Sequence, residues 1–71
     1  MKDTEQAKNF IEIALNGLEK SVNEDNKMAI QQNTQTFNVL ISEYKNMVGR
    51  KEVKNYLNNY AEIINGRKYL K

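Results

Sequence analysis

The sequence predicts an all-α fold, a small three-helix bundle with helices near residues 4–22, 25–48 and 50–65. Three observations predict it. Apolar residues recur at alternating intervals of three and four positions, which is the repeat of an amphipathic helix. Proline is absent, so no residue forbids a long helix. Only three glycines occur, and two of them stand where a helix is expected to end.

The size of the chain limits it to one domain, which we place at residues 1–66. With 71 residues, a lone hydrophobic core is marginal, and small domains usually add a disulfide, a metal or a partner. Cysteine and histidine are both absent, which removes disulfides and the usual zinc ligands. Self-association or partner binding is therefore the expected additional support.

The first helix is predicted from Asp3, as an N-cap with Gln6 behind it, to about residue 22. Its apolar stripe comprises Ala7, Ile11, Ala14, Leu15, Leu18 and Val22. Asn16-Gly17 is a possible turn, but the stripe keeps its phase across it, which favours a continuous helix. Beside the stripe runs an acidic row of Glu5, Glu12 and Glu19, which we interpret as a solvated edge in preference to a cation site.

The second helix, near residues 25–48, carries the stripe that organises the chain: Ile30, Thr34, Phe37, Ile41, Tyr44 and Val48. A polar connection over residues 23–27 precedes it, and Ser21 or Asn23 is a candidate cap. Its weakest part is residues 31–36, where asparagine and threonine favour helix poorly. Residues 36–42 could instead form a strand, and the helix could break near Asn33. The structural alternative to the bundle is a two-helix hairpin with a long bent arm. A continuous helix of this length would overhang its neighbours, which favours a homodimer through it.

The third helix is expected to follow Gly49 and to end at Asn65-Gly66. Its apolar face comprises Val53, Tyr56, Leu57, Tyr60, Ala61, Ile63 and Ile64. Residues 67–71 are predicted to form a basic, flexible tail.

Composition argues against an enzyme and against a cofactor. Without histidine or cysteine, the commonest general base and the most nucleophilic side chain are missing. No glycine-rich phosphate loop is present. No apolar run reaches the roughly 18–20 residues that span a bilayer, and no signal peptide is evident, so we expect a cytoplasmic protein.

A non-enzymatic protein-binding module, acting as an adaptor, inhibitor or regulator, is the function that these features favour. Its partner is a protein, and a homo-oligomer is expected. An asparagine-rich, cysteine-free chain of this size is compatible with a phage or mobile-element regulator. Candidate interface residues are apolar side chains on polar faces or at the edges of the second stripe: Ile13, Met28, Val39, Leu40 and Met47.

Nucleic-acid binding is the alternative, because residues 49–71 carry six basic and two acidic side chains. The candidate contacts are Arg50, Lys51, Lys54, Asn55, Asn58, Arg67 and Lys68. Tyr56 and Tyr60 could stack on bases, but their place on the apolar face favours a core role. Membrane-surface binding is less favoured, because Glu52 and Glu62 interrupt the basic face of the third helix.

Overall fold

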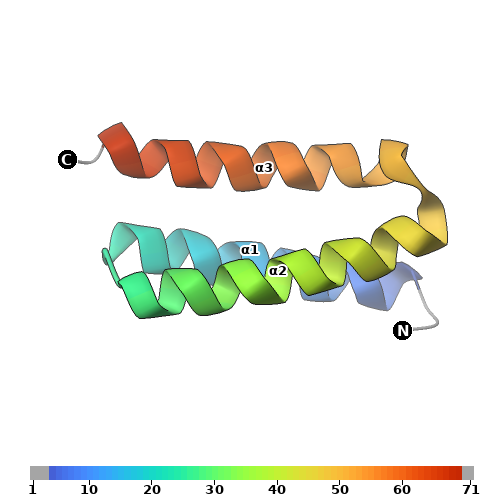
Figure 1. Ribbon diagram of the computed structural model, residues 1–71, viewed down its shortest axis with the longest axis horizontal. Helices are drawn as coiled ribbons and strands as arrows, with labels where there is room; N and C mark the ends of the chain where they lie inside the picture. Colours follow the sequence, from blue (N-terminus) through green and yellow to red (C-terminus); the bar gives the residue numbers. More distant parts are fainter. Residues whose placement is uncertain (1–3, 70–71) are drawn as a thin grey trace.

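The computed structural model describes the backbone of residues 4–69 and the side chains of residues 4–66 (Figure 1). Over this part of the chain there are three helices and no strand: α1 (Thr4–Asn23), α2 (Lys27–Val48) and α3 (Arg50–Tyr69). The helices run up, down and up, with α1 and α2 forming a hairpin and α3 lying along it (Figure 1). The predicted three-helix bundle is confirmed, and the strand considered over residues 36–42 is part of α2.

The core lies where the predicted stripes meet. All six apolar residues predicted on the first helix are buried, as are Phe37, Ile41 and Tyr44 of α2. Phe37 stacks on Tyr60 with ring centroids 5.0 Å apart, and Tyr44 meets Tyr56 edge-on at 5.9 Å. Tyr56 and Tyr60 of α3 therefore pack against the α2 core, as their place on the apolar face predicts.

The first connection is shorter than predicted. Asn26 caps α2, with its side-chain Oδ1 accepting a 3.1 Å hydrogen bond from the Ala29 N–H. Asp25, with φ of 52°, makes the reversal that leads into this cap. The predicted cap Ser21 has another role: its hydroxyl donates to the Gly17 carbonyl at 2.7 Å and accepts from Asn33 Nδ2 at 2.9 Å. The predicted cap Asp3 lies outside the described residues.

Two glycines that the sequence suggests as helix ends behave differently. Gly49 ends α2 with φ of 90°, and its N–H donates to the Lys45 carbonyl at 2.7 Å. Gly66, in contrast, is helical, and α3 continues to Tyr69. A glycine without left-handed backbone costs a helix only about 1 kcal/mol, so Asn65-Gly66 is not a sufficient stop signal. Of the predicted tail, residues 67–69 are thus helical in backbone, and residues 70–71 lie outside the described part.

The helices are matched in length, with 20 residues in α1, 22 in α2 and 20 in α3. The second helix is continuous through Asn33, but it does not have the 24 residues expected for it. Over the described residues α2 has 22 residues and its neighbours have 20 each. The predicted overhang of the second helix therefore does not support a homodimer.

Candidate functional site

Two surface grooves run along the sides of α3, one against each helix of the hairpin. The groove between α1 and α3 has a volume of about 880 Å³, and we call it the acidic groove because Glu12, Glu19 and Glu62 line it. The groove between α2 and α3 has a volume of about 640 Å³. We call it the basic groove, because all its charged lining residues are cations: Lys45, Arg50, Lys51 and Lys54.

The basic groove has an apolar floor shared by two helices. Ile41 comes from α2, and Val53 and Leu57 come from α3. Ile41 and Val53 are nearly buried, whereas Leu57 is 45% exposed. The turn at Gly49 sets this arrangement, because residues equally far from the turn on two antiparallel helices lie opposite one another. Ile41 and Leu57 are each eight positions from Gly49, Lys45 and Val53 are each four positions from it, and all four line the groove.

The cations of the basic groove stand on both of its walls and are exposed. Lys45 belongs to α2, while Arg50, Lys51 and Lys54 belong to the first turns of α3. None of the four makes an ion pair with a described carboxylate; the ion pair that is seen, between Lys8 and Glu5 at 3.6 Å, lies on α1. Like charges gathered around a groove create a positive potential that attracts an acidic ligand.

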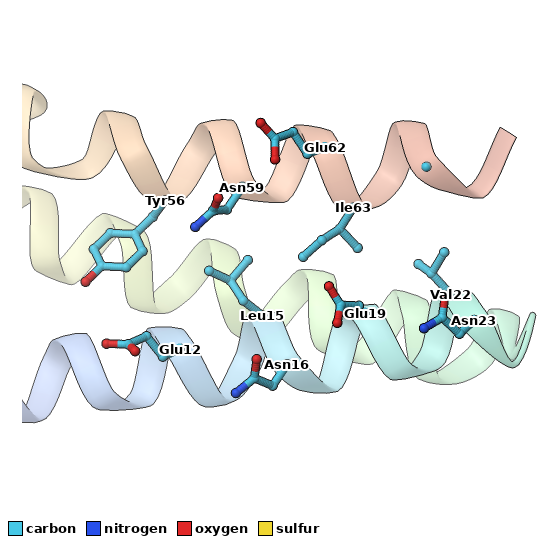
Figure 2. A pocket seen from close by; sticks show the side chains of 11 residues that line it. Glu12, Leu15, Asn16, Glu19, Val22, Asn23, Tyr56, Asn59, Glu62 and Ile63 are labelled. Carbon is cyan, nitrogen blue, oxygen red and sulfur yellow. The ribbon is translucent and has the colours of Figure 1, made fainter. Parts of the chain in front are cut away.

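The acidic groove differs in its composition and in its floor. Figure 2 shows Leu15 and Ile63 reaching into it from α1 and α3, with the carboxylates of Glu12, Glu19 and Glu62 spread along it. Tyr56 reaches from α3 toward α1 at one end (Figure 2). Partial burial, and next the charge of Glu12, raise the pKa of the Tyr56 hydroxyl above its ordinary value of 10.0.

The five candidate interface residues fall on separate surfaces. Ile13, Met28 and Val39 are 64%, 72% and 59% exposed, whereas Leu40 and Met47 are half-buried and pack against the core. Met28 and Val39 are eleven positions apart on α2, which places them on one face, three turns from each other. That face is opposite the buried positions of α2, and Ile13 belongs to another helix. The structure therefore does not gather the five into one patch.

The candidate nucleic-acid contacts also fall into separate groups, inside and outside the basic groove. Arg50, Lys51 and Lys54 line the basic groove, while Asn55 and Asn58 are exposed on α3 outside its lining. The side chains of Arg67 and Lys68 lie outside the described part of the chain.

Sequence reasoning missed Lys45 and Leu57 as site residues. Leu57 belongs with Val53 to the apolar face predicted for the third helix, but Leu57 and Ala61 of this face are exposed. A signal was available: pairing positions across the predicted Gly49 turn brings Lys45 next to Lys54, and Ile41 next to Leu57. Phe10 of α1 is a further exposed apolar residue, with 41% of its surface exposed.

No group of histidine, cysteine, aspartate and glutamate side chains in residues 4–66 is arranged to hold a metal ion. No helix in the described part has both the length and the apolar character of a bilayer-crossing segment. Comparison with protein families, with curated proteins and with solved structures finds no match to this chain, so its function is argued from its own surfaces.

Proposed function

We propose that this chain is a small, non-enzymatic protein-binding module that acts as an adaptor, inhibitor or regulator of a protein partner. The observation that carries the proposal is the basic groove, where Leu57 remains 45% exposed on an otherwise buried apolar floor. Protein interfaces combine a central apolar contact with a charged rim, and this groove has both parts.

Pull-down from a lysate of the host, with the tagged chain and with and without nuclease, tests this function. We expect a stoichiometric protein prey that survives nuclease treatment. Material that disappears after nuclease treatment would contradict the proposal and would favour the alternative function below.

Self-association is a separate part of the proposal and belongs to the outer face of α2. The exposed side chains between Met28 and Ser42 carry no charge, and Met28 and Val39 lie on one line among them. Depletion of charge is characteristic of interface cores. Sedimentation equilibrium should show a dimer that Val39→Glu converts to a monomer, because the new carboxylate would be brought close to its symmetry mate. A monomeric unmodified chain would contradict the dimer without affecting the groove.

Nucleic-acid binding is the second candidate, and the clustering of Arg50, Lys51 and Lys54 with Lys45 favours it. Four cations along one groove can neutralise phosphates. Two observations make it the weaker candidate. The apolar floor offers nothing to a phosphodiester backbone, and Tyr56 and Tyr60 are engaged with Tyr44 and Phe37 and are not free to stack on bases.

A further inference from the structure

We propose that the basic groove is the docking site for an acidic amphipathic helix of the partner protein, one that presents a narrow apolar stripe flanked by aspartate or glutamate. This inference rests on the proposed protein-binding function and names the chemistry of the partner.

The groove lies between two helices, which is the setting of a helix-binding groove. Its two walls are the antiparallel helices α2 and α3, and a third helix lying over them would complete a local three-helix arrangement. The partner's apolar residues, at spacings of three and four, would cover Leu57, which lies beside the nearly buried Ile41 and Val53. Covering Leu57 supplies the central desolvated contact on which affinity depends.

The charge of the groove selects the partner's flanks. Because Lys45 stands on one wall and Arg50, Lys51 and Lys54 on the other, a docked helix would meet cations on both sides of its apolar stripe. Carboxylates at both flanks satisfy this arrangement, whereas a basic or neutral helix would leave four positive charges facing it. Pairs at an exposed rim contribute little affinity, so their effect is mainly on orientation, association rate and the rejection of basic partners.

The first helix of a second copy is a poor occupant of this groove. Its acidic residues Glu12 and Glu19 line its own acidic groove, where the neighbouring Leu15 and Val22 are buried against the core. The most exposed apolar residue of α1, Ile13, shares its side of the helix with Asn9, Asn16 and Lys20. No described face of α1 therefore presents an exposed apolar stripe flanked by carboxylates.

The test uses the full chain and a designed probe. The probe is a fluorescent helical peptide of about 18 residues, five turns long, with leucine along one face and glutamate on both flanks. A matched peptide carries lysine in place of every glutamate. A single-stranded and a double-stranded oligonucleotide are titrated in parallel, and binding is followed by fluorescence anisotropy.

Three variants, each checked for an unchanged cooperative melt, locate the binding. Leu57→Gln removes the exposed part of the floor, and the double variant Lys51→Glu/Lys54→Glu reverses two rim charges. The control Lys20→Glu/Lys27→Glu changes net charge equally at exposed cations outside the groove. Because Leu57 and the two rim lysines are exposed, these substitutions should leave the fold intact.

We expect the acidic peptide to bind, and the lysine peptide not to bind. Leu57→Gln and Lys51→Glu/Lys54→Glu should each weaken binding about tenfold, and the control pair by less than about twofold. Raising the salt concentration should reduce the effect of the charge-reversal variant and leave that of Leu57→Gln unchanged, because salt screens exposed charges only.

Several results would overturn the inference. The first is a failure of the acidic peptide to bind at about 1 mM, which means a binding free energy weaker than about −4 kcal/mol. The second is a loss of affinity in the control pair equal to that in Lys51→Glu/Lys54→Glu. The third is an affinity that Leu57→Gln does not change. Oligonucleotide binding that Lys51→Glu/Lys54→Glu abolishes would assign the groove to nucleic acid. Repeating the pull-down with Leu57→Gln separates the two proposals. A protein prey that this variant retains would overturn the groove as the docking site and leave the protein-binding function standing. The absence of any protein prey with the unmodified chain would overturn the proposed function.

Discussion

Two regions of the molecule differ in the size of the side chains that build them. One is the seam between α1 and α2, and the other is the contact that α3 makes with this hairpin. The seam contains small residues, including Ala14, Gly17 and Ser21, which are buried or half-buried. At Gly17 the Asn33 side chain approaches so closely that a methyl group there would lie 3.0 Å from Oδ1. In α3, Val53 is the one buried residue among the described side chains, and Tyr56 and Tyr60 make the ring contacts.

The difference explains where the grooves lie. The distance between packed helices depends on the side chains at the contact, and small residues allow close approach whereas aromatic rings do not. Tyr56 and Tyr60 make the ring contacts between α3 and α2. The basic groove lies beside residues 50–57 of α3 and the acidic groove beside residues 56–66. The hairpin supplies stability, and α3 supplies exposed surface. Three predictions follow from this division, beginning with the largest effect.

The same substitution should have different effects in the two regions. Leu18 of α1 is fully buried, so Leu18→Ala should lower the free energy of unfolding by about 3 kcal/mol. Leu57 of α3 is 45% exposed, so Leu57→Ala should cost less than about 1 kcal/mol. Chemical denaturation measures both values. Equal losses would show that α3 is packed as tightly as the hairpin.

Two helical glycines provide a second matched pair. Nothing lies within 4 Å of a Cβ added at Gly66, so Gly66→Ala should raise the free energy of unfolding by about 0.5–1 kcal/mol through helix propensity. At Gly17 the new methyl group would displace Asn33, whose side chain donates a 2.9 Å hydrogen bond to Ser21. Gly17→Ala should therefore gain nothing or destabilise.

A double variant sharpens this prediction. In an Asn33→Ala background the obstructing side chain is gone, so Gly17→Ala should there stabilise the chain nearly as much as Gly66→Ala does. A gain from Gly17→Ala in the unmodified chain equal to that from Gly66→Ala would contradict the tight seam.

The smallest effect is a pH dependence at the edge of the acidic groove. Burial raises the pKa of Tyr56 in the folded chain above 10.0, its ordinary value. The protonated hydroxyl therefore favours the folded state fully below pH 10.0, and this contribution is lost as the pH rises through the raised pKa. Tyr56→Phe should make the alkaline fall in melting temperature shallower. An unchanged alkaline slope would show that Tyr56 ionises alike in both states.

The sequence predicts the helices better than it predicts their surfaces. Periodicity identifies the buried faces of α1 and α2, and the Gly49 stop follows from its position after Val48. The continuation through Gly66 could not be read from the sequence, because a helical glycine and a terminating glycine have the same local context. The cap at Asn26 was missed because several polar residues around it are equally able to cap.

The grooves were less predictable than the helices for a physical reason. Whether Leu57 is buried or exposed depends on how far the tyrosines hold α3 from α2, which is a property of three-dimensional packing and not of spacing along the chain. The separation of Ile13 from Met28 and Val39 likewise depends on how the helices are rotated in the bundle. Charge is easier to predict, since pairing residues across the Gly49 turn already places Lys45 near Lys54.

Native-state hydrogen exchange tests most directly the division between a stable hairpin and a loosely packed α3. Amides of α1 and α2 around Gly17 and Phe37 should exchange slowest, near the rate set by global unfolding, and those of α3 from Lys54 to Ile64 at least about tenfold faster. The result that would contradict this division is equal amide protection in all three helices, with the same dependence on denaturant concentration. It would mean that α3 unfolds only together with the hairpin.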